Sequence, residues 1–163
     1  MGLNGHIYLF QASIAVLGMK RSLTSFNINK TDEENSTTLV VALRQKKFDF
    51  VKYLLRLPHI STTIYSHKYG LPLHIALQQS EFKLALKLLK RQDQLLQNKA
   101  PEESVELDVN VPNEQGNTAL HLVFMNFNQN PELATLVAKI LIKKGANLRA
   151  KNKNELGLLH AAV

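Results

Sequence analysis

Three histidines in the sequence follow similar short apolar motifs, and their repetition is the first feature that could carry chemistry. They are His74 in YGLPLHIA (69–76), His121 in GNTALHLV (116–123) and His160 in ELGLLHAA (155–162). Imidazole can bind zinc or act as a general acid or base. Equivalent residues of packed helical units lie about 10 Å apart, however, whereas zinc needs each ligand nitrogen at about 2 Å. We therefore expect these histidines to be structural.

No other set of residues has the spacing of a catalytic or metal site. His59 and His67 share a predicted loop but have no cysteine or acidic partner at ligand spacing. The chain has no cysteine, which excludes thiolate chemistry and disulfides. No G-x-S-x-G, H-E-x-x-H or glycine-rich phosphate loop occurs. The sequence thus predicts a protein that is not an enzyme and uses no cofactor or metal.

The composition is that of one globular domain. Of the 163 residues, 45% are hydrophobic, and the formal net charge is +7. The most apolar N-terminal run, residues 7–19, is shorter than the roughly 20 residues of a membrane span, and its basic residues follow it instead of preceding it. We expect a cytoplasmic, intracellular protein in which residues 1–26 form a helical capping segment.

The histidine motif belongs to a longer internal repeat. A degraded first copy, NSTTLVVA (35–42), has Val40 in the histidine position, and the four marked positions are 34, 47 and 39 residues apart. A base period near 33 residues explains this spacing if polar insertions occupy 92–106 and 126–132. Repeats with loop insertions are therefore predicted.

Each copy of the motif has the same flanking elements. Hairpin-like stretches precede it at 27–36, 108–117 and 147–156, and segments with helical spacing follow it at 48–57, 81–90 and 133–145. Pro72 suits a first helical turn, Thr118 can cap its helix through its side-chain oxygen, and Gly145 can end a helix in the left-handed conformation. Four leucines at equivalent positions should be buried: Leu39, Leu73, Leu120 and Leu159.

The segment KKGANLRAKNKNELGLLHAA, with GNTALHLV and YGLPLHIA, resembles the ankyrin repeat family. The resemblance implies an all-α, ankyrin-type α-solenoid of helix–turn–helix units with hairpin-like loops, about 3.5 repeats in all. The family's Thr-Pro pair is complete nowhere in this chain, which leaves the local capping of the helices open. The expected units are 35–66, 69–107 and 116–149 with a partial unit at 155–163, all within 27–163. Because that last unit lacks a second helix, we expect the chain to be a fragment of a longer repeat protein.

The resemblance also implies a non-enzymatic scaffold that binds a partner protein through hairpin tips and a concave inner-helix face. Carried over by position, the tip residues are Asp32, Glu33, Glu34, Ser66, His67, Lys68, Tyr69, Glu114, Gln115, Asn117, Lys151, Asn152, Lys153 and Glu155. The inner-helix residues are Arg44, Gln45, Gln78, Gln79, Met125 and Asn126. Tyr69 and Met125 are the best anchor candidates, because aromatic and adaptable side chains dominate binding hot spots.

Two alternative functions remain open. The chain could be the targeting module of a larger enzyme, channel or effector truncated at its C-terminus. It could also bind nucleic acid or an anionic membrane through a basic stripe on the outer helices, although acidic interruptions and the lack of interleaved aromatic residues make such partners less favoured. The stripe comprises Lys46, Lys47, Lys52, Arg56, Lys83, Lys87, Lys90, Arg91, Lys139, Lys143 and Lys144.

Overall fold

The computed structural model describes residues 27–98 and 106–161. The predicted N-terminal cap (1–26), the last two residues of the chain and residues 99–105 of the predicted insertion lie outside the described residues. The side chain of Leu159, which we expected to be buried, is also outside the described part. Within 27–98 and 106–161, no helix combines the length and the apolar character needed to cross a bilayer.

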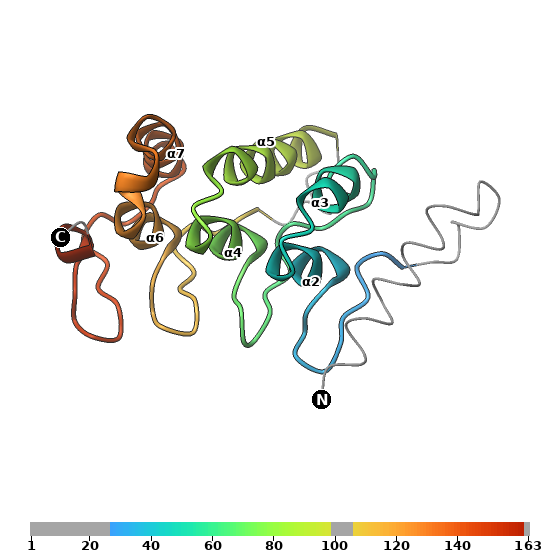
Figure 1. Cartoon of the computed structure of the whole chain (residues 1–163), viewed down its shortest axis with the longest axis horizontal. Helices are drawn as coiled ribbons and strands as arrows, with labels where there is room; N and C mark the ends of the chain where they lie inside the picture. The colour runs from blue at the N-terminus through green and yellow to red at the C-terminus, as the bar shows by residue number, and fades with distance from the viewer. Residues whose placement is uncertain (1–26, 99–105, 162–163) are drawn as a thin grey trace.

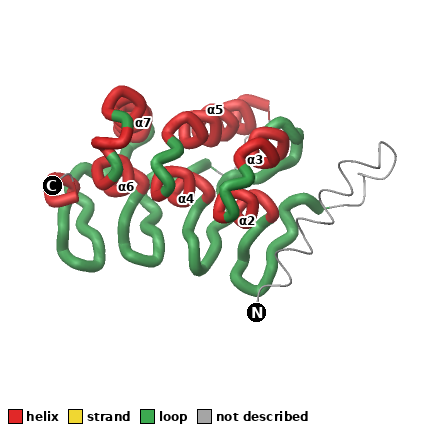
Figure 2. Tube along the Cα trace, viewed as in Figure 1, coloured by secondary structure: helices red, strands yellow, loops and turns green. Residues whose placement is uncertain are grey.

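The described chain is a row of helix pairs joined by loops (Figures 1 and 2). The inner helices lie side by side along the molecule, the outer helices form a second layer on one side of them, and the hairpin loops project on the other side. The prediction of an all-helical stack is confirmed. The elements are α2 (Thr38–Arg44), α3 (Phe48–Leu54), α4 (Pro72–Gln78), α5 (Phe82–Asn98), α6 (Ala119–Met125), the 3-10 helix η2 (Phe127–Gln129), α7 (Pro131–Lys143) and α8 (Leu158–Ala161).

Local sequence signals fix the ends of the inner helices. The Thr37 hydroxyl accepts a hydrogen bond from Val40 N at 3.3 Å and so caps α2. Pro72 begins α4, where its missing N–H leaves no intrahelical bond unmade. After α2 and α4, Lys46 and Ser80 adopt left-handed φ values of 55° and 60°, which turn the chain back into the outer helix.

The hairpins are short loops, and single antiparallel bridges close the first, second and fourth of them. These bridges join Thr31 to Thr37, Ser66 to Gly70, and Lys151 to Gly157. Three of the loops have a left-handed residue at the same position, namely Asn35, Gly116 and Glu155. In the second unit the left-handed residue comes one position later, at Gly70, where φ is 72°. The second hairpin therefore has a different turn from the other three.

One hydrophobic core runs through the stack, and the predicted leucine anchors lie in it. Leu39, Leu73 and Leu120 are all buried, at 0%, 2% and 1% exposure, as expected for the three of the four that the structure describes. Each should contribute about 2 kcal/mol through removal of its side chain from water. Helix α2 packs on α4, α4 on α6, and α6 on α8, so the core is continuous from unit to unit.

Both segments predicted as insertions contain helical residues. Residues 92–98 continue α5, and in this stretch Gln92 is buried and accepts a hydrogen bond from Thr62 Oγ1 at 2.8 Å. In the second segment, the turn η2 leads to Asn130, whose side chain caps α7 by accepting from Leu133 N at 3.1 Å. Polar residues in these segments therefore serve helix formation and contacts between units.

Amide side chains at the ends of the inner helices connect neighbouring units. Gln79 Nε2, after α4, donates to the Leu43 carbonyl of α2 at 3.1 Å. Asn126 Nδ2, at the same position after α6, donates to the Leu77 carbonyl of α4 at 3.1 Å. The amide of each unit thus satisfies a helix-end carbonyl of the preceding unit.

We expect Asn126→Ala to lower the free energy of unfolding by about 1–2 kcal/mol, because its side-chain hydrogen bonds are lost and the Leu77 and Leu122 carbonyls keep only their bonds to backbone N–H groups. Besides the bond to Leu77, Asn126 Nδ2 donates to the Leu122 carbonyl, and its Oδ1 accepts from Ser80 Oγ. Urea denaturation followed by circular dichroism measures the change. Gln78→Ala is the matched control, because Gln78 is an exposed amide at the end of α4; an equal loss in both variants would contradict the assignment.

Candidate protein-binding surface

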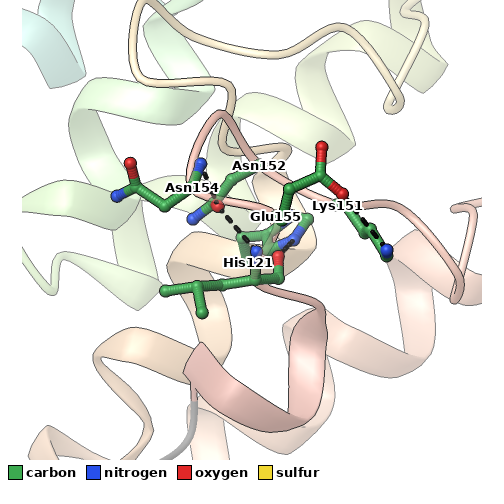
Figure 3. Close-up of polar contacts among 6 residues, drawn as sticks. His121, Lys151, Asn152, Asn154 and Glu155 are labelled. Atoms are coloured by element: carbon green, nitrogen blue, oxygen red, sulfur yellow. Dashed lines mark hydrogen bonds and ion pairs between the residues drawn. The ribbon is translucent and has the colours of Figure 1, made fainter.

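The hairpin tips are held in shape by side chains at their base. The Oδ1 atom of Asp32, Asn113 or Asn152 accepts hydrogen bonds from two backbone N–H groups of its own loop, at distances between 2.8 and 3.1 Å. Figure 3 shows this arrangement around Asn152. These bonds imitate a backbone turn and fix each tip before any partner binds.

Adjacent tips are also joined to each other. His67 N donates to the Glu34 carbonyl at 3.0 Å, and Ser36 Oγ and Ser66 Oγ lie 2.8 Å apart in the same pair of hairpins. Between the third and fourth hairpins, Lys153 N donates to the Gln115 carbonyl at 3.3 Å. The first tip is therefore joined to the second, and the third tip to the fourth.

His121, which we expected to be structural, has hydrogen-bond contacts at both ring nitrogens. Its Nδ1 lies 3.3 Å from Thr118 N and 2.9 Å from Thr118 Oγ1, and its Nε2 lies 3.3 Å from the Leu156 carbonyl of the next hairpin (Figure 3). This pattern fits the tautomer with the proton on Nε2. Thr118 and His121 form a capping box at the start of α6, in which the Thr118 hydroxyl also pairs with the imidazole.

His74 occupies the same position in α4 and is fully buried. Its Nδ1 accepts a hydrogen bond from Leu71 N at 3.1 Å. Burial lowers the pKa of His74 to about 4, because charging the ring away from water is unfavourable, and the Val111 backbone opposes this shift. The contact with Val111 is looser than a hydrogen bond of normal geometry, since Nε2 has no such partner among the described residues.

His160 differs from the other two histidines because its ring is exposed. The described residues include no further unit beyond α8 that its side chain could bridge. Within residues 27–98 and 106–161, no three side chains of histidine, aspartate or glutamate lie close enough to hold a metal ion.

Arg44 and Tyr69 form the most distinctive contact on the tip side of the stack. The Arg44 guanidinium carbon lies 3.7 Å from the centroid of the Tyr69 ring, and Lys68 Nζ lies 5.7 Å from the same centroid. Tyr69 packs partly into the core, whereas Arg44 is exposed. The ring thus holds an exposed cation in place at the end of α2.

The last residue of each inner helix is the point at which that helix meets solvent. Arg44, Gln78 and Met125 are exposed at this equivalent position, and the exposed fraction of Met125 is 53%. The next residue in each unit is only partly exposed, and Gln79 and Asn126 use their side chains for the inter-unit bonds described above. The inner helices therefore offer a partner mainly these three side chains.

The predicted partner-binding residues divide into two groups. The exposed group contains Glu33, Glu34, Arg44, His67, Lys68, Gln78, Glu114, Gln115, Met125, Lys151, Lys153 and Glu155, with Gln45 and Tyr69 partly exposed. The side chains of the second group form hydrogen bonds inside the fold; they are Asp32, Ser66, Gln79, Asn117, Asn126 and Asn152. We define the hairpin–helix surface as the twelve exposed residues of the first group together with the partly exposed Tyr69.

The sequence analysis did not identify the asparagines that connect the bases of the hairpins. Asn29 Nδ2 donates to the His59 carbonyl at 2.6 Å while its Oδ1 accepts from Ser61 N at 2.8 Å. Asn110 makes the same two bonds, to the Gly145 carbonyl at 3.0 Å and from Asn147 N at 2.7 Å. The signal available in the sequence was an asparagine three residues before Asp32 and again three residues before Asn113.

Part of the predicted basic stripe is used inside the protein. Lys144 pairs with Asp93 between α7 and α5, and Lys52 Nζ lies 2.9 Å from an Asp49 carboxylate oxygen. The Lys52 contact lowers the pKa of Asp49. Arg91 donates to the carbonyls of Leu57 and Pro58, at 2.6 and 3.0 Å. These three cations bind protein groups, which reduces the charge available to a phosphate-bearing partner.

The stacked helix pairs, the contact of His121 with the next hairpin and the bonds between hairpins define a helical repeat protein. Residues 115–153 match the family model of the ankyrin repeat, so the chain carries an ankyrin repeat there, and the resemblance noted in the sequence is confirmed. The match covers the end of the third hairpin, α6, η2, α7 and the fourth hairpin as far as residue 153. Comparison with curated proteins gave no match to the chain. Ankyrin repeats are in general protein-interaction modules, and no enzyme family matches.

Proposed function

We propose that the protein is an intracellular, non-enzymatic scaffold that binds a partner protein through the hairpin–helix surface. The partner presents a carboxylate group to Arg44 and an apolar side chain to Met125. The other exposed tip residues supply polar contacts around these two anchors.

The observation that carries this proposal is the Arg44–Tyr69 contact of 3.7 Å. A surface arginine normally loses considerable side-chain entropy when it binds, and stacking on an aromatic ring removes part of that loss in advance. A guanidinium fixed in this way can still form two parallel hydrogen bonds with a carboxylate. The linked tips support the same conclusion, because little backbone ordering is needed on binding.

Arg44→Glu should weaken partner binding at least tenfold, corresponding to about 1.4 kcal/mol, because it replaces attraction to a carboxylate with repulsion. The partner is first identified by proximity labelling in the native cell, then purified and titrated against each variant by calorimetry. Tyr69→Ala should also weaken binding because it frees Arg44, whereas Tyr69→Phe keeps the ring and should bind like the parent protein.

Lys90→Glu provides the control for charge, since Lys90 is an exposed cation on the outer helix α5. It changes the net charge of the protein as much as Arg44→Glu does but lies away from the hairpin–helix surface. Binding that weakens equally in both variants would show a general electrostatic attraction and would refute the proposed surface. Unchanged binding in Arg44→Glu would refute it as well.

A further inference from the structure

The residues that close the hairpins allow the three junctions between neighbouring hairpins to be compared. In each hairpin, a backbone hydrogen bond joins two closing residues that are four positions apart, at 32/36, 66/70, 113/117 and 152/156. At the first junction, Ser36 Oγ lies 2.8 Å from Ser66 Oγ. At the third junction, Asn152 Nδ2 donates to Asn117 Oδ1 at 2.9 Å. At both junctions, the last closing residue of one hairpin therefore bonds to the first closing residue of the next.

The second junction lacks this bond because Gly70, the last closing residue of its hairpin, has no side chain. The first closing residue of the third hairpin is Asn113, whose buried Nδ2 has no hydrogen-bond partner among the described residues, and the same is true of His74 Nε2. Because His74 Nδ1 accepts from Leu71 N, Nε2 carries the ring proton, and both unpaired atoms are donors. A Cβ atom on Gly70 would lie 2.6 Å from His74 Nδ1 and 3.3 Å from Asn113 Cβ, so both side chains lie beside Gly70.

Two other kinds of bond between hairpins are also missing from the second junction in the described part of the chain. Glu114 N, at the position from which the second and fourth tips donate to the preceding tip, makes no bond to the second hairpin. The asparagine that connects the hairpin bases is replaced by Thr63, whose hydroxyl pairs with Ser61 of the same segment. Among residues 27–98 and 106–161, the hydrogen bond that does join these two hairpins runs from Tyr65 Oη to the Pro112 carbonyl, at 3.0 Å.

The helix side of the second junction is well bonded. Asn126 connects α6 to the Leu77 carbonyl of α4, and its Oδ1 also accepts from Ser80 Oγ at 3.1 Å. Asp93 and Lys144 pair between the outer helices α5 and α7. Helix α4 packs against α6 as α2 packs against α4. The second junction is therefore held at its helices and weakly joined at its hairpins.

We propose that the second junction is a hinge, about which the first two hairpins open and close as a pair against the last two. The pivot is the helix side, around Asn126, and the opening lies between Gly70 and Asn113. Water that enters the opening accepts hydrogen bonds from the two unpaired donors, so the polar groups of this junction favour opening. The apolar contact of α4 with α6 keeps the two halves together.

The hinge divides the hairpin–helix surface into two halves. Arg44 lies in the first half and Met125 in the second, so the distance between these two proposed anchors changes as the hinge opens. The hinge is a property of the chain alone. Its test needs no partner, and it can fail while the proposed function stands.

Pairs of introduced cysteines carrying nitroxide labels test the hinge, since the chain has no cysteine of its own. Three pairs use the exposed residue that follows the first closing residue of each hairpin: Glu33→Cys with His67→Cys, His67→Cys with Glu114→Cys, and Glu114→Cys with Lys153→Cys. Neighbouring units are about 10 Å apart, and dipolar broadening of the EPR spectrum in frozen solution measures such distances. We expect the distance distribution across the second junction to be at least twice as wide as either of the others. Equal widths at the three junctions would overturn the proposal.

Two pairs on the inner helices test the position of the pivot. Arg44→Cys with Gln78→Cys spans the first junction, and Gln78→Cys with Met125→Cys spans the second, at equivalent exposed positions. We expect distributions of equal width from these two pairs. If the second of them is as broad as the pair at His67 and Glu114, whole units separate instead of turning about the helices, and the hinge is refuted.

Asn117→Ala tests the cause, because it removes at the third junction the bond that the second junction lacks. This variant should broaden the distribution of the pair at Glu114 and Lys153 and leave that of the pair at Glu33 and His67 unchanged. Circular dichroism verifies that every labelled variant folds. If the distribution at Glu114 and Lys153 keeps its width, bonds between closing residues do not hold the hairpins together, and the proposal loses its basis.

Discussion

Replacement of Gly116 by alanine should lower the free energy of unfolding by about 3 kcal/mol or more. Gly116 has a φ of 81°, in the left-handed region where a Cβ atom costs about 1–2 kcal/mol. An added Cβ would also lie 2.6 Å from the backbone nitrogen of Lys153 and 3.2 Å from the carbonyl carbon of Asn152. Because the nearest atoms belong to the backbone, the fourth hairpin must move away from the third to accommodate the methyl group.

Gly145→Ala separates these two effects. Gly145 has a similar φ of 85°, but a Cβ added there meets no atom within 4 Å. This variant should therefore lose only the conformational part, about 1 kcal/mol. Urea denaturation of both variants under identical conditions gives the comparison, and a loss in Gly116→Ala no larger than that in Gly145→Ala would show that the hairpins are not packed as described.

The second large expected effect is a loss of folding stability at acidic pH. Burial lowers the pKa of His74 to about 4 in the folded protein, whereas the ordinary value of 6.5 applies to the unfolded chain. Between these pH values the unfolded chain binds a proton that the folded protein does not bind, so stability falls as the pH falls. The contribution of neutral His74 is fully present above pH 6.5, and its loss by pH 4 should amount to about 3 kcal/mol.

Denaturation at a series of pH values from about 7 to 4.5 measures this dependence. His74→Gln should show a smaller decrease in stability over that range, because it removes the group that takes up the proton. His160→Gln is the control, since His160 is exposed, and it should keep the slope of the parent protein. If both glutamine variants retain the full slope, carboxylates and not His74 cause the acid sensitivity.

The fold was largely predictable because its signals are local and repeated. Apolar residues at helical spacing identify the same elements in successive units, and a histidine three residues after the N-cap marks three of the four inner helices. Gly145, the predicted end of α7, has a left-handed φ of 85°. Repetition makes such signals reliable, because one weak motif recurs in register. The burial of Leu39, Leu73 and Leu120 followed directly from their place in the motif.

The continuation of α5 to Asn98 was not predictable from the same signals. Its final turns are rich in polar residues, a composition that normally indicates a loop. What stabilises this part of the helix is tertiary: Gln92 bonds to Thr62, and Asp93 pairs with Lys144 from a helix about 50 residues later in the chain. Contacts of this kind leave no periodic trace in the sequence.

The hairpin–helix surface was predicted only in outline, since position in the repeat identifies which residues reach the tips but not what they do there. Asp32 and Asn117 resemble surface residues by type, yet both accept hydrogen bonds inside the fold. The Arg44–Tyr69 contact joins residues from two different units and depends on the bend of a hairpin. Side-chain roles of this kind require the structure.

The hydrogen bonds that asparagine and glutamine side chains form between helices and between hairpins each reach only the adjacent unit. None of these hydrogen bonds depends on the total length of the chain or on the length of the insertion that follows Asp93. Such a molecule can gain, lose or exchange whole modules, and can accept extra residues at the outer turns, without disturbing its distant parts. The unequal intervals of 34, 47 and 39 residues between the motifs are consistent with an evolutionary history of that kind.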